Sequence, residues 1–153
     1  MPKTIPLAQC VKIMQDMQAK ANDLEPVMAH IANALYNSTS QSFEKESSPF
    51  GEKWTPLAPS TLKKSKGIKK KLIDKGKLVK SIHTAHTSTQ ASIGTNIKYA
   101  AIHQFGGYAG RGHKSKIPQR AFLPIDKEGN IPKNVQEDIK EAVIDYMLED
   151  FKS

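Results

Sequence analysis

The fold of this chain is decided by the stretch A-S-I-G-T-N-I-K-Y-A-A-I-H-Q-F-G-G (91–107), followed after a polar insert by I-P-Q-R-A-F-L-P (117–124). The apolar run within the first segment, 99–105, ends at Gly106 and Gly107, because residues without a Cβ adopt backbone angles closed to other residues. Prolines flank the second segment, so a strand there would be short or lie at a sheet edge. The pattern predicts two core-anchored segments that hold a mobile basic loop between them.

The length and composition predict one domain that spans residues 1–153, with long loops at 44–71 and 107–117. The single cysteine, Cys10, excludes an internal disulfide framework and lies in an apolar setting typical of a buried small side chain rather than a nucleophile. There is no signal peptide pattern and no run of eighteen apolar residues. We therefore expect a soluble protein that folds in a reducing compartment, without membrane contact.

Charge is distributed unevenly along the chain, whose formal net charge is +8. The segment Lys63–Lys80 contains nine lysines and one acid, and it alone carries +8. The segment 131–153 contains three lysines and six acids, which gives −3. A basic middle and an acidic tail can complement each other between subunits, or they can face different partners.

Apolar residues at three- and four-residue spacing predict two N-terminal helices, over 7–24 and from Pro26 to about Phe43. A C-terminal helix is predicted after Pro132, with Asn134 and Glu137 as a capping pair. It carries two apolar stripes, one to cover the sheet and a second that is free for a subunit contact.

Alternation over 78–87 and 91–95 predicts two strands joined by a hairpin connection at 87–90. A short helical turn can begin at 60–62. The order of elements predicts an α+β fold, with a small, mostly antiparallel sheet, two N-terminal helices, one C-terminal helix and long flexible basic loops. Trp54, held between a glycine turn and two prolines, is expected to be buried against the sheet or the second helix; a partner-binding role is the alternative.

No combination of residues predicts catalysis. The glycines at 106, 107, 110 and 112 lack the spacing of a phosphate-binding loop, and no serine has a nucleophile-elbow context. His103 is expected to be a hydrogen-bonded core or turn residue rather than a base. The histidines at 83, 86, 103 and 113 have no cysteine or carboxylate near them in sequence, so no metal site and no cofactor is predicted.

Nucleic-acid binding through Lys63–Lys80 is the alternative function. Such a run binds phosphates without sequence preference and with strong salt dependence. It lacks the interleaved aromatic residues that stack on bases. The candidate contacts to DNA or to a protein partner are Lys63, Lys64, Lys66, Lys69, Lys70, Lys71, Arg111, Lys114 and Lys116.

Four blocks occur in the order F-G-E-K-W-T-P-L-A-P-S-T (50–61), L-I-D-K-G-K-L-V-K-S-I (72–82), I-G-T-N-I-K-Y-A-A-I-H-Q-F-G-G (93–107) and I-P-Q-R-A-F-L-P (117–124). Over roughly residues 26–150 the chain resembles the virion morphogenesis (tail-completion) family of Mu-like tailed phages and prophages. Lys75 stands where members commonly have threonine. The residues that match the family motifs are Gly51, Trp54, Pro56, Leu57, Leu72, Ile73, Asp74, Gly76, Leu78, Ser81, Ile82, Tyr99, Ala100, His103, Gln104, Phe105, Gly106, Pro118, Arg120, Phe122 and Leu123.

The resemblance implies a non-enzymatic structural protein that completes the tail so that a filled head can join it. It also implies a homo-oligomeric ring, often sixfold, that contacts tail tube or terminator proteins and head-connector proteins. Such a ring would form in the host cytoplasm and remain at the head–tail junction of the virion. Its basic loops could touch the DNA that passes through it.

Overall fold

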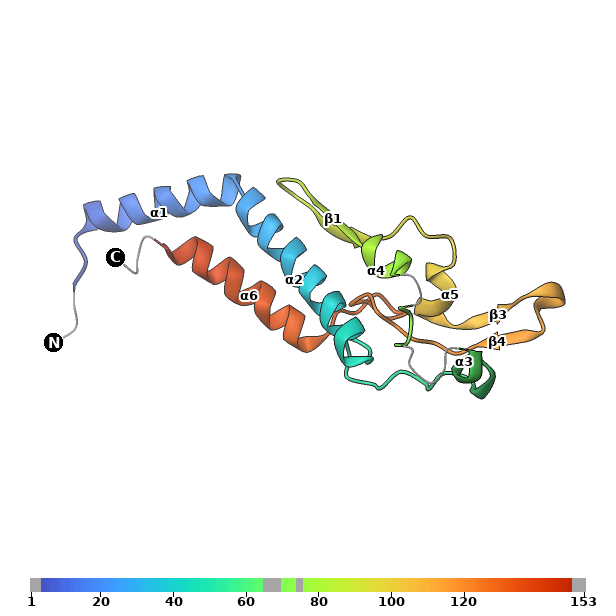
Figure 1. The fold of residues 1–153 in the computed structure, drawn as a ribbon. Helices are drawn as coiled ribbons and strands as arrows, with labels where there is room; N and C mark the ends of the chain where they lie inside the picture. The colour runs from blue at the N-terminus through green and yellow to red at the C-terminus, as the bar shows by residue number, and fades with distance from the viewer. Residues whose placement is uncertain (1–3, 65–69, 74–75, 150–153) are drawn as a thin grey trace.

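The computed structural model describes residues 4–64, 70–73 and 76–149. The described chain is elongated (Figure 1). Helix α1 (Leu7–Asn22) and the C-terminal part of helix α6 (Lys133–Leu148) lie at one end, and a β-hairpin projects at the other.

The three long helices form where the apolar periodicity predicted them. Helix α2 (Glu25–Lys45) carries Pro26 in its first turn, where the missing N–H leaves no bond unmade. The capping prediction for α6 is wrong: the helix begins at Lys133 after Pro132, without a side-chain cap. Gln136 Nε2 instead donates to the carbonyl of Ile131 at 2.6 Å.

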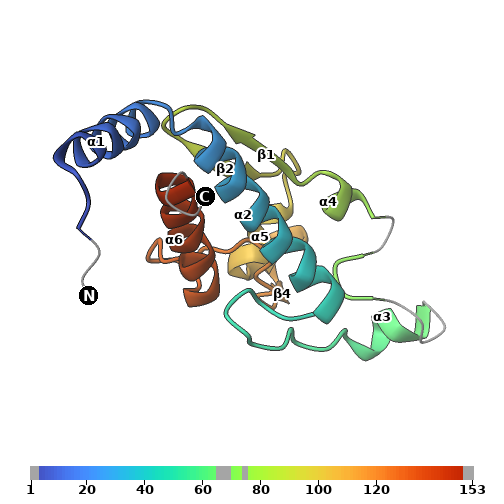
Figure 2. The same ribbon diagram turned by 90° about the vertical axis from the view of Figure 1, so that its left-hand side faces the viewer.

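Helix α6 packs along α2 and touches α1, and it does not cover a sheet (Figure 2). The prediction that one of its apolar stripes lies on the sheet is therefore wrong. Helix α2 takes that place, because it packs against both strands of the first hairpin as well as against α6. Val135 is the buried residue that α6 contributes.

The first hairpin pairs β1 (His83–His86) with β2 (Ala91–Gly94) in antiparallel register, as the alternation predicted. The predicted strand start at Leu78 is wrong, because Lys77–Lys80 forms the short helix α4. Gly76 precedes this helix with a φ of 69°, a conformation that glycine tolerates. Leu78 and Ile82 both enter the core, and their four-residue spacing matches a helical turn rather than a strand.

The segment 107–117, expected to be a long flexible loop, forms a second hairpin. Strands β3 (Gly107–Ala109) and β4 (Ser115–Ile117) are antiparallel and are joined through the 3-10 turn η1 (Arg111–His113). The described strands thus form two separate two-stranded sheets rather than one. Within the other predicted loop, α2 extends to Lys45 and the expected helical turn appears as α3 (Pro59–Lys64).

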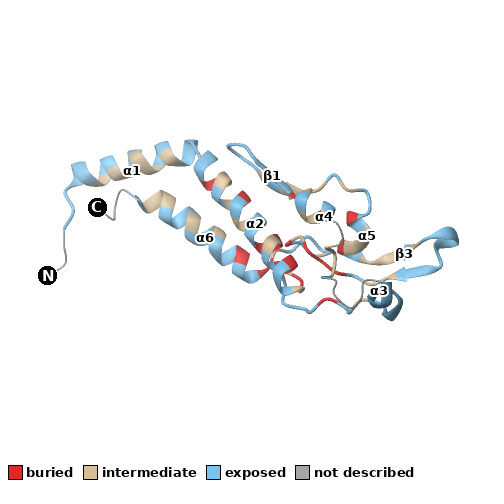
Figure 3. Cartoon of the chain, viewed as in Figure 1, coloured by how far each residue is buried: buried red, intermediate tan, exposed pale blue. Residues whose placement is uncertain are grey.

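The buried core lies where the C-terminal half of α2 meets α4, helix α5 (Ala100–Phe105) and the segment 120–124 (Figure 3). Helix α1 contributes no buried residue; Leu7 is 80% exposed and Met14 is 69% exposed. Cys10 is only partly buried, so the expectation of a buried cysteine is wrong. None of the described helices is both long enough and apolar enough to cross a membrane.

Candidate functional site

The four sequence blocks meet at one place, which we call the motif core. Its buried apolar members are Phe43, Trp54, Leu78, Ile82, Ala100 and Phe122. Phe43 comes from α2, and the others come one or two from each block. The sequence motifs therefore mark a single packing centre rather than four separate sites.

Trp54 is 3% exposed and joins its loop to the centre of the motif core. Its ring stands edge-on to Phe43, with centroids 5.6 Å apart, and Phe43 in turn lies 5.4 Å from Phe122. The indole Nε1 donates to the carbonyl of Ala121 at 2.8 Å. The predicted burial against the second helix is confirmed, and the indole N–H has the partner that a buried donor needs.

The side chain of Gln104 binds the backbone of segment 122–125, which follows the second hairpin. Its amide is 2% exposed. Oε1 accepts from the backbone N–H groups of Phe122 and Leu123, both at 2.9 Å. Nε2 donates to the carbonyls of Leu123 at 3.2 Å and Ile125 at 3.1 Å. One side chain thus supplies four hydrogen bonds to a segment that has no strand partner.

Arg120 makes the second tie between blocks. It is 7% exposed, and its Nε and Nη2 donate to the carbonyls of Thr55 at 2.9 Å and Pro56 at 3.0 Å. Burial lowers the pKa of Arg120, and the charge of Glu46 acts in the opposite direction. The guanidinium binds the loop that contains Trp54 and Pro56, so it is not presented to an external anion.

His103 lies beside this tie. Its carbonyl accepts from Arg120 N at 2.8 Å, and its ring stands edge-on to Tyr99. Burial lowers the pKa of His103 below its usual 6.5, and the charge of Arg120 lowers it further. Its Nδ1 is buried without a hydrogen-bond partner among the described residues, which departs from the hydrogen-bonded ring that we expected.

Gly106 is required by close packing. Its φ is +71°, and a Cβ there would stand 3.0 Å from the backbone N of Gln119. Any other residue would separate α5 from the returning chain. Gly106 therefore fixes how closely the third and fourth blocks approach each other.

The remaining motif residues surround this centre. Ser81 Oγ donates to the carbonyl of Leu78 at 2.7 Å. Tyr99, which precedes α5, and Phe105, its last residue, keep 46% and 42% of their surface exposed. Asp74 lies outside the described residues. Leu57, Pro118 and Leu123 are partly buried, while Gly51 and Pro56 are exposed.

Among the basic candidates in the described residues, Lys71 is bound to Glu46 and the others are exposed. Lys71 Nζ lies 3.1 Å from Glu46 Oε2, and its backbone N–H donates to Glu46 Oε1 at 2.6 Å. The backbone hydrogen bond is the main cause that lowers the pKa of Glu46 below its usual 4.5. Lys66 and Lys69 lie outside the described residues. The exposed candidates are Lys63 and Lys64 on α3, Lys70 after it, and Arg111, Lys114 and Lys116 on the second hairpin.

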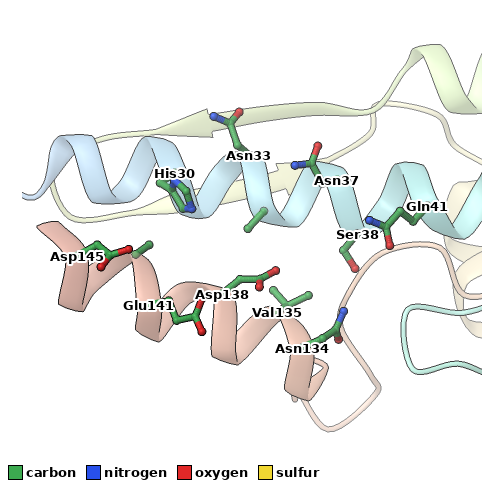
Figure 4. A pocket seen from close by; sticks show the side chains of 12 residues that line it. His30, Asn33, Asn37, Ser38, Gln41, Asn134, Val135, Asp138, Glu141 and Asp145 are labelled. Atoms are coloured by element: carbon green, nitrogen blue, oxygen red, sulfur yellow. The ribbon is translucent and has the colours of Figure 1, made fainter.

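A polar groove between α2 and α6 was not anticipated from the sequence (Figure 4). Its volume is about 280 Å³. From α2, Asn33, Asn37 and Gln41 line it at four-residue spacing, and from α6, Asp138 and Glu141 do. The signal in the sequence was this amide stripe beside the apolar face of α2. Within the described ranges, no group of three or more His, Cys, Asp or Glu residues is placed to hold a metal.

Residues 5–147 match the profile of the phage virion morphogenesis family. The chain belongs to this family. The match runs from α1 through α6, so it includes all four blocks and both hairpins.

Two relatives of this chain come from a Mu-like prophage and from phage Mu. "Mu-like prophage FluMu G protein 2" of Haemophilus influenzae is 37% identical over 79% of this chain and 76% of its own length. "Putative capsid assembly protein G" of Escherichia phage Mu is 34% identical over 65% of this chain and 67% of its own length. No solved structure matches the chain significantly. Together these similarities give this virion morphogenesis protein a structural or morphogenetic role in a phage.

Proposed function

We propose that this virion morphogenesis protein is a non-enzymatic subunit that completes the tail and joins it to the head, working as a ring at the tail terminus. The observation that carries the proposal is how the motif core uses its polar groups. Trp54, Gln104 and Arg120 bond to carbonyls and N–H groups of the chain itself. These motifs build a scaffold, and none of the three offers a free group for chemistry.

The surfaces left for partners lie outside this scaffold. The second hairpin carries exposed basic residues at one end of the molecule, and α6 presents acidic residues in the other half. A basic surface at one end and an acidic surface in the other half are two complementary surfaces, which the head-to-tail contacts of a ring require. Tail tube or terminator proteins and head-connector proteins would contact the two faces of this ring. Its basic side chains could make non-specific contacts with DNA in transit.

Light scattering and negative-stain microscopy of the purified protein, alone and mixed with isolated tails, test this function. We expect closed rings, and we expect them at the end of the tail tube that meets the head. A protein that stays monomeric at high concentration and does not bind tails would contradict the proposal.

A further inference from the structure

We propose that the second hairpin of one copy docks in the groove between α2 and α6 of the next copy. This contact would be the ring interface, so the inference rests on the function proposed above and names the surfaces that would carry it. The occupant of the groove is a second copy of this chain, and charge complementarity between the two surfaces is the argument.

The hairpin has the form of an arm. Among the described elements its main contact outside the hairpin is with α5, which precedes it directly in the chain, and the hairpin projects from the body (Figure 1). Between 107 and 117 the sequence contains Arg111, Lys114 and Lys116 and no acid. Tyr108 and Lys116 are directly paired across the strands, so they share a face of the hairpin, and Tyr108 is 60% exposed. Tyrosine and arginine are enriched at protein contact surfaces, and the hairpin carries one of each, Tyr108 and Arg111.

The groove has the complementary chemistry. Its acidic side chains come from α6, where Asp138 and Glu141 are exposed, and no lysine or arginine lines it. From α2, the amides of Asn33, Asn37 and Gln41 are also among the groups that line it. Amides supply donors and acceptors together, which is what the unpaired edge of a short strand requires. A second hollow lined by Pro26, Val27 and Tyr146 continues it toward α1.

The hairpin and the groove lie in opposite halves of the molecule, so a hairpin docks in another copy and not in its own groove. Such a head-to-tail contact is heterologous: each copy gives its hairpin to one neighbour and its groove to the other. Contacts of this type generate closed rings when the rotation closes.

DNA is a less suitable occupant for the same hairpin. Three basic side chains neutralise few phosphates, so the electrostatic gain is small at physiological salt. Nucleic acid would also leave the acidic groove of every copy without a partner. We therefore assign the hairpin to protein contact, and retention of DNA becomes an outcome of the test.

Paired charge reversals test the assignment. One full-length variant carries Lys114→Glu and Lys116→Glu, and the other carries Asp138→Lys and Glu141→Lys. Alone, each variant places like charges at the contact, and self-association measured by light scattering should weaken roughly 100-fold or more. Mixed in equal amounts, the variants should recover the size of the wild-type assembly, because each hairpin then meets a groove of opposite charge.

The matched control is Lys53→Glu with Lys98→Glu, which makes the same change of charge at exposed positions outside the hairpin and outside the groove lining. This control should assemble like the wild type. All variants should keep the wild-type circular dichroism spectrum and melting temperature, since the substituted side chains are exposed.

Several results would overturn the inference: reversed variants that assemble alone, a mixture that stays dissociated, or a wild type that remains monomeric or stops at a two-fold dimer. Loss of DNA retention in the Lys114/Lys116 variant with its assembly intact would also overturn it and would assign the hairpin to nucleic acid. If the wild type forms rings on tails while the reversals have no effect, the docking assignment fails and the proposed function stands. If the wild type does not bind tails, the proposed function fails.

Discussion

Gln104 shows what the motif residues do at the scale of single side chains. The segment 121–125 passes through the molecule without a strand neighbour, and its backbone groups need partners once they are buried. The Gln104 amide supplies them on both of its sides, accepting two N–H groups and donating to two carbonyls. A residue that is polar in the sequence is therefore a structural part of the core.

Replacing Gln104 with leucine should lower the free energy of unfolding by roughly 2–6 kcal/mol, because two backbone N–H groups would lose their acceptor at about 1–3 kcal/mol each. Urea denaturation followed by circular dichroism measures this. Gln119→Leu is the control: it removes one hydrogen bond, from an exposed side chain to the carbonyl of Gln104, and should cost about 0.5–1.5 kcal/mol. Equal effects of the two substitutions would contradict the role given to Gln104.

Trp54→Ala should destabilise the protein by about 3–5 kcal/mol, since it empties the centre of the motif core. Trp54→Phe should cost less, because it keeps an aromatic ring in the motif core. It should still destabilise the protein, since the Ala121 carbonyl loses its donor. Thermal denaturation of both variants makes the comparison. A Trp54→Ala protein as stable as the wild type would show that the ring is available for docking instead.

His103 gives a pH dependence of known sign. Its pKa is lowered in the folded state, so the unfolded chain binds the proton more readily below the usual value of 6.5. Stability is therefore complete above that value and falls as the pH drops through the window beneath it. His103→Gln should flatten this part of the stability curve, measured by urea midpoints between about pH 5 and 7. A slope unchanged in His103→Gln would contradict the assignment.

At the scale of elements, α1 is held to the body by a few polar contacts at its C-terminal end. Lys20 Nζ donates to the carbonyl of Tyr146 at 2.9 Å, and the Tyr146 hydroxyl donates to the carbonyl of Asp23 at 2.6 Å. Val11, nearer the N-terminus of the helix, is 44% exposed. The helix is therefore anchored at its C-terminal end, and much of its apolar stripe is exposed.

Tyr146→Phe should loosen this anchor while the motif core stays intact. Loss of the hydroxyl removes one hydrogen bond, so we expect faster amide exchange in α1 with a global stability lower by only about 0.5–1.5 kcal/mol. Hydrogen exchange followed by mass spectrometry resolves the two effects. Uniformly faster exchange across α1, α2 and α5 would show that the contact supports the whole fold.

The sequence predicted the long elements because their periodicity is sustained over several turns, as in α2 and α6. It also predicted the first hairpin, whose strands alternate on either side of a polar turn. The second hairpin was missed because its strands have three residues each and include Gly107 and Lys116 on a Gly- and Lys-rich background. Helix α5 was missed because six residues are too few for periodicity to separate a helix from a turn.

The sequence predicted only part of the candidate site. The motif residues could be named from the sequence, and Trp54 could be placed in the core. The hydrogen bonds made by the side chains of Gln104 and Arg120 join residues 18 to 65 positions apart in the chain, and a spacing pattern does not report such contacts. The groove depends on how α2 and α6 pack, which their separate sequences do not specify. The periodicity of α1 likewise does not specify which surface its apolar stripe contacts.

At the scale of the whole molecule, the chain is elongated, with a buried centre and two different ends. The family places it in virion morphogenesis, and the name of the Mu relative refers to capsid assembly. Virion assembly should stop at different stages when a capsid assembly protein or a tail-completion protein is removed. This difference separates the proposed function from the role in that relative's name.

Electron microscopy of lysates from a phage or inducible prophage that carries this gene, with the gene deleted, is therefore the most direct measurement. We expect filled heads and separate finished tails, and we expect infectious particles to be restored when the purified protein is added to the extract. The Lys53→Glu/Lys98→Glu protein, changed at exposed positions outside the proposed contact surfaces, is the control and should restore infectious particles as the wild type does. Lysates with no filled heads, or with heads already joined to tails, would contradict a role in tail completion and head–tail joining.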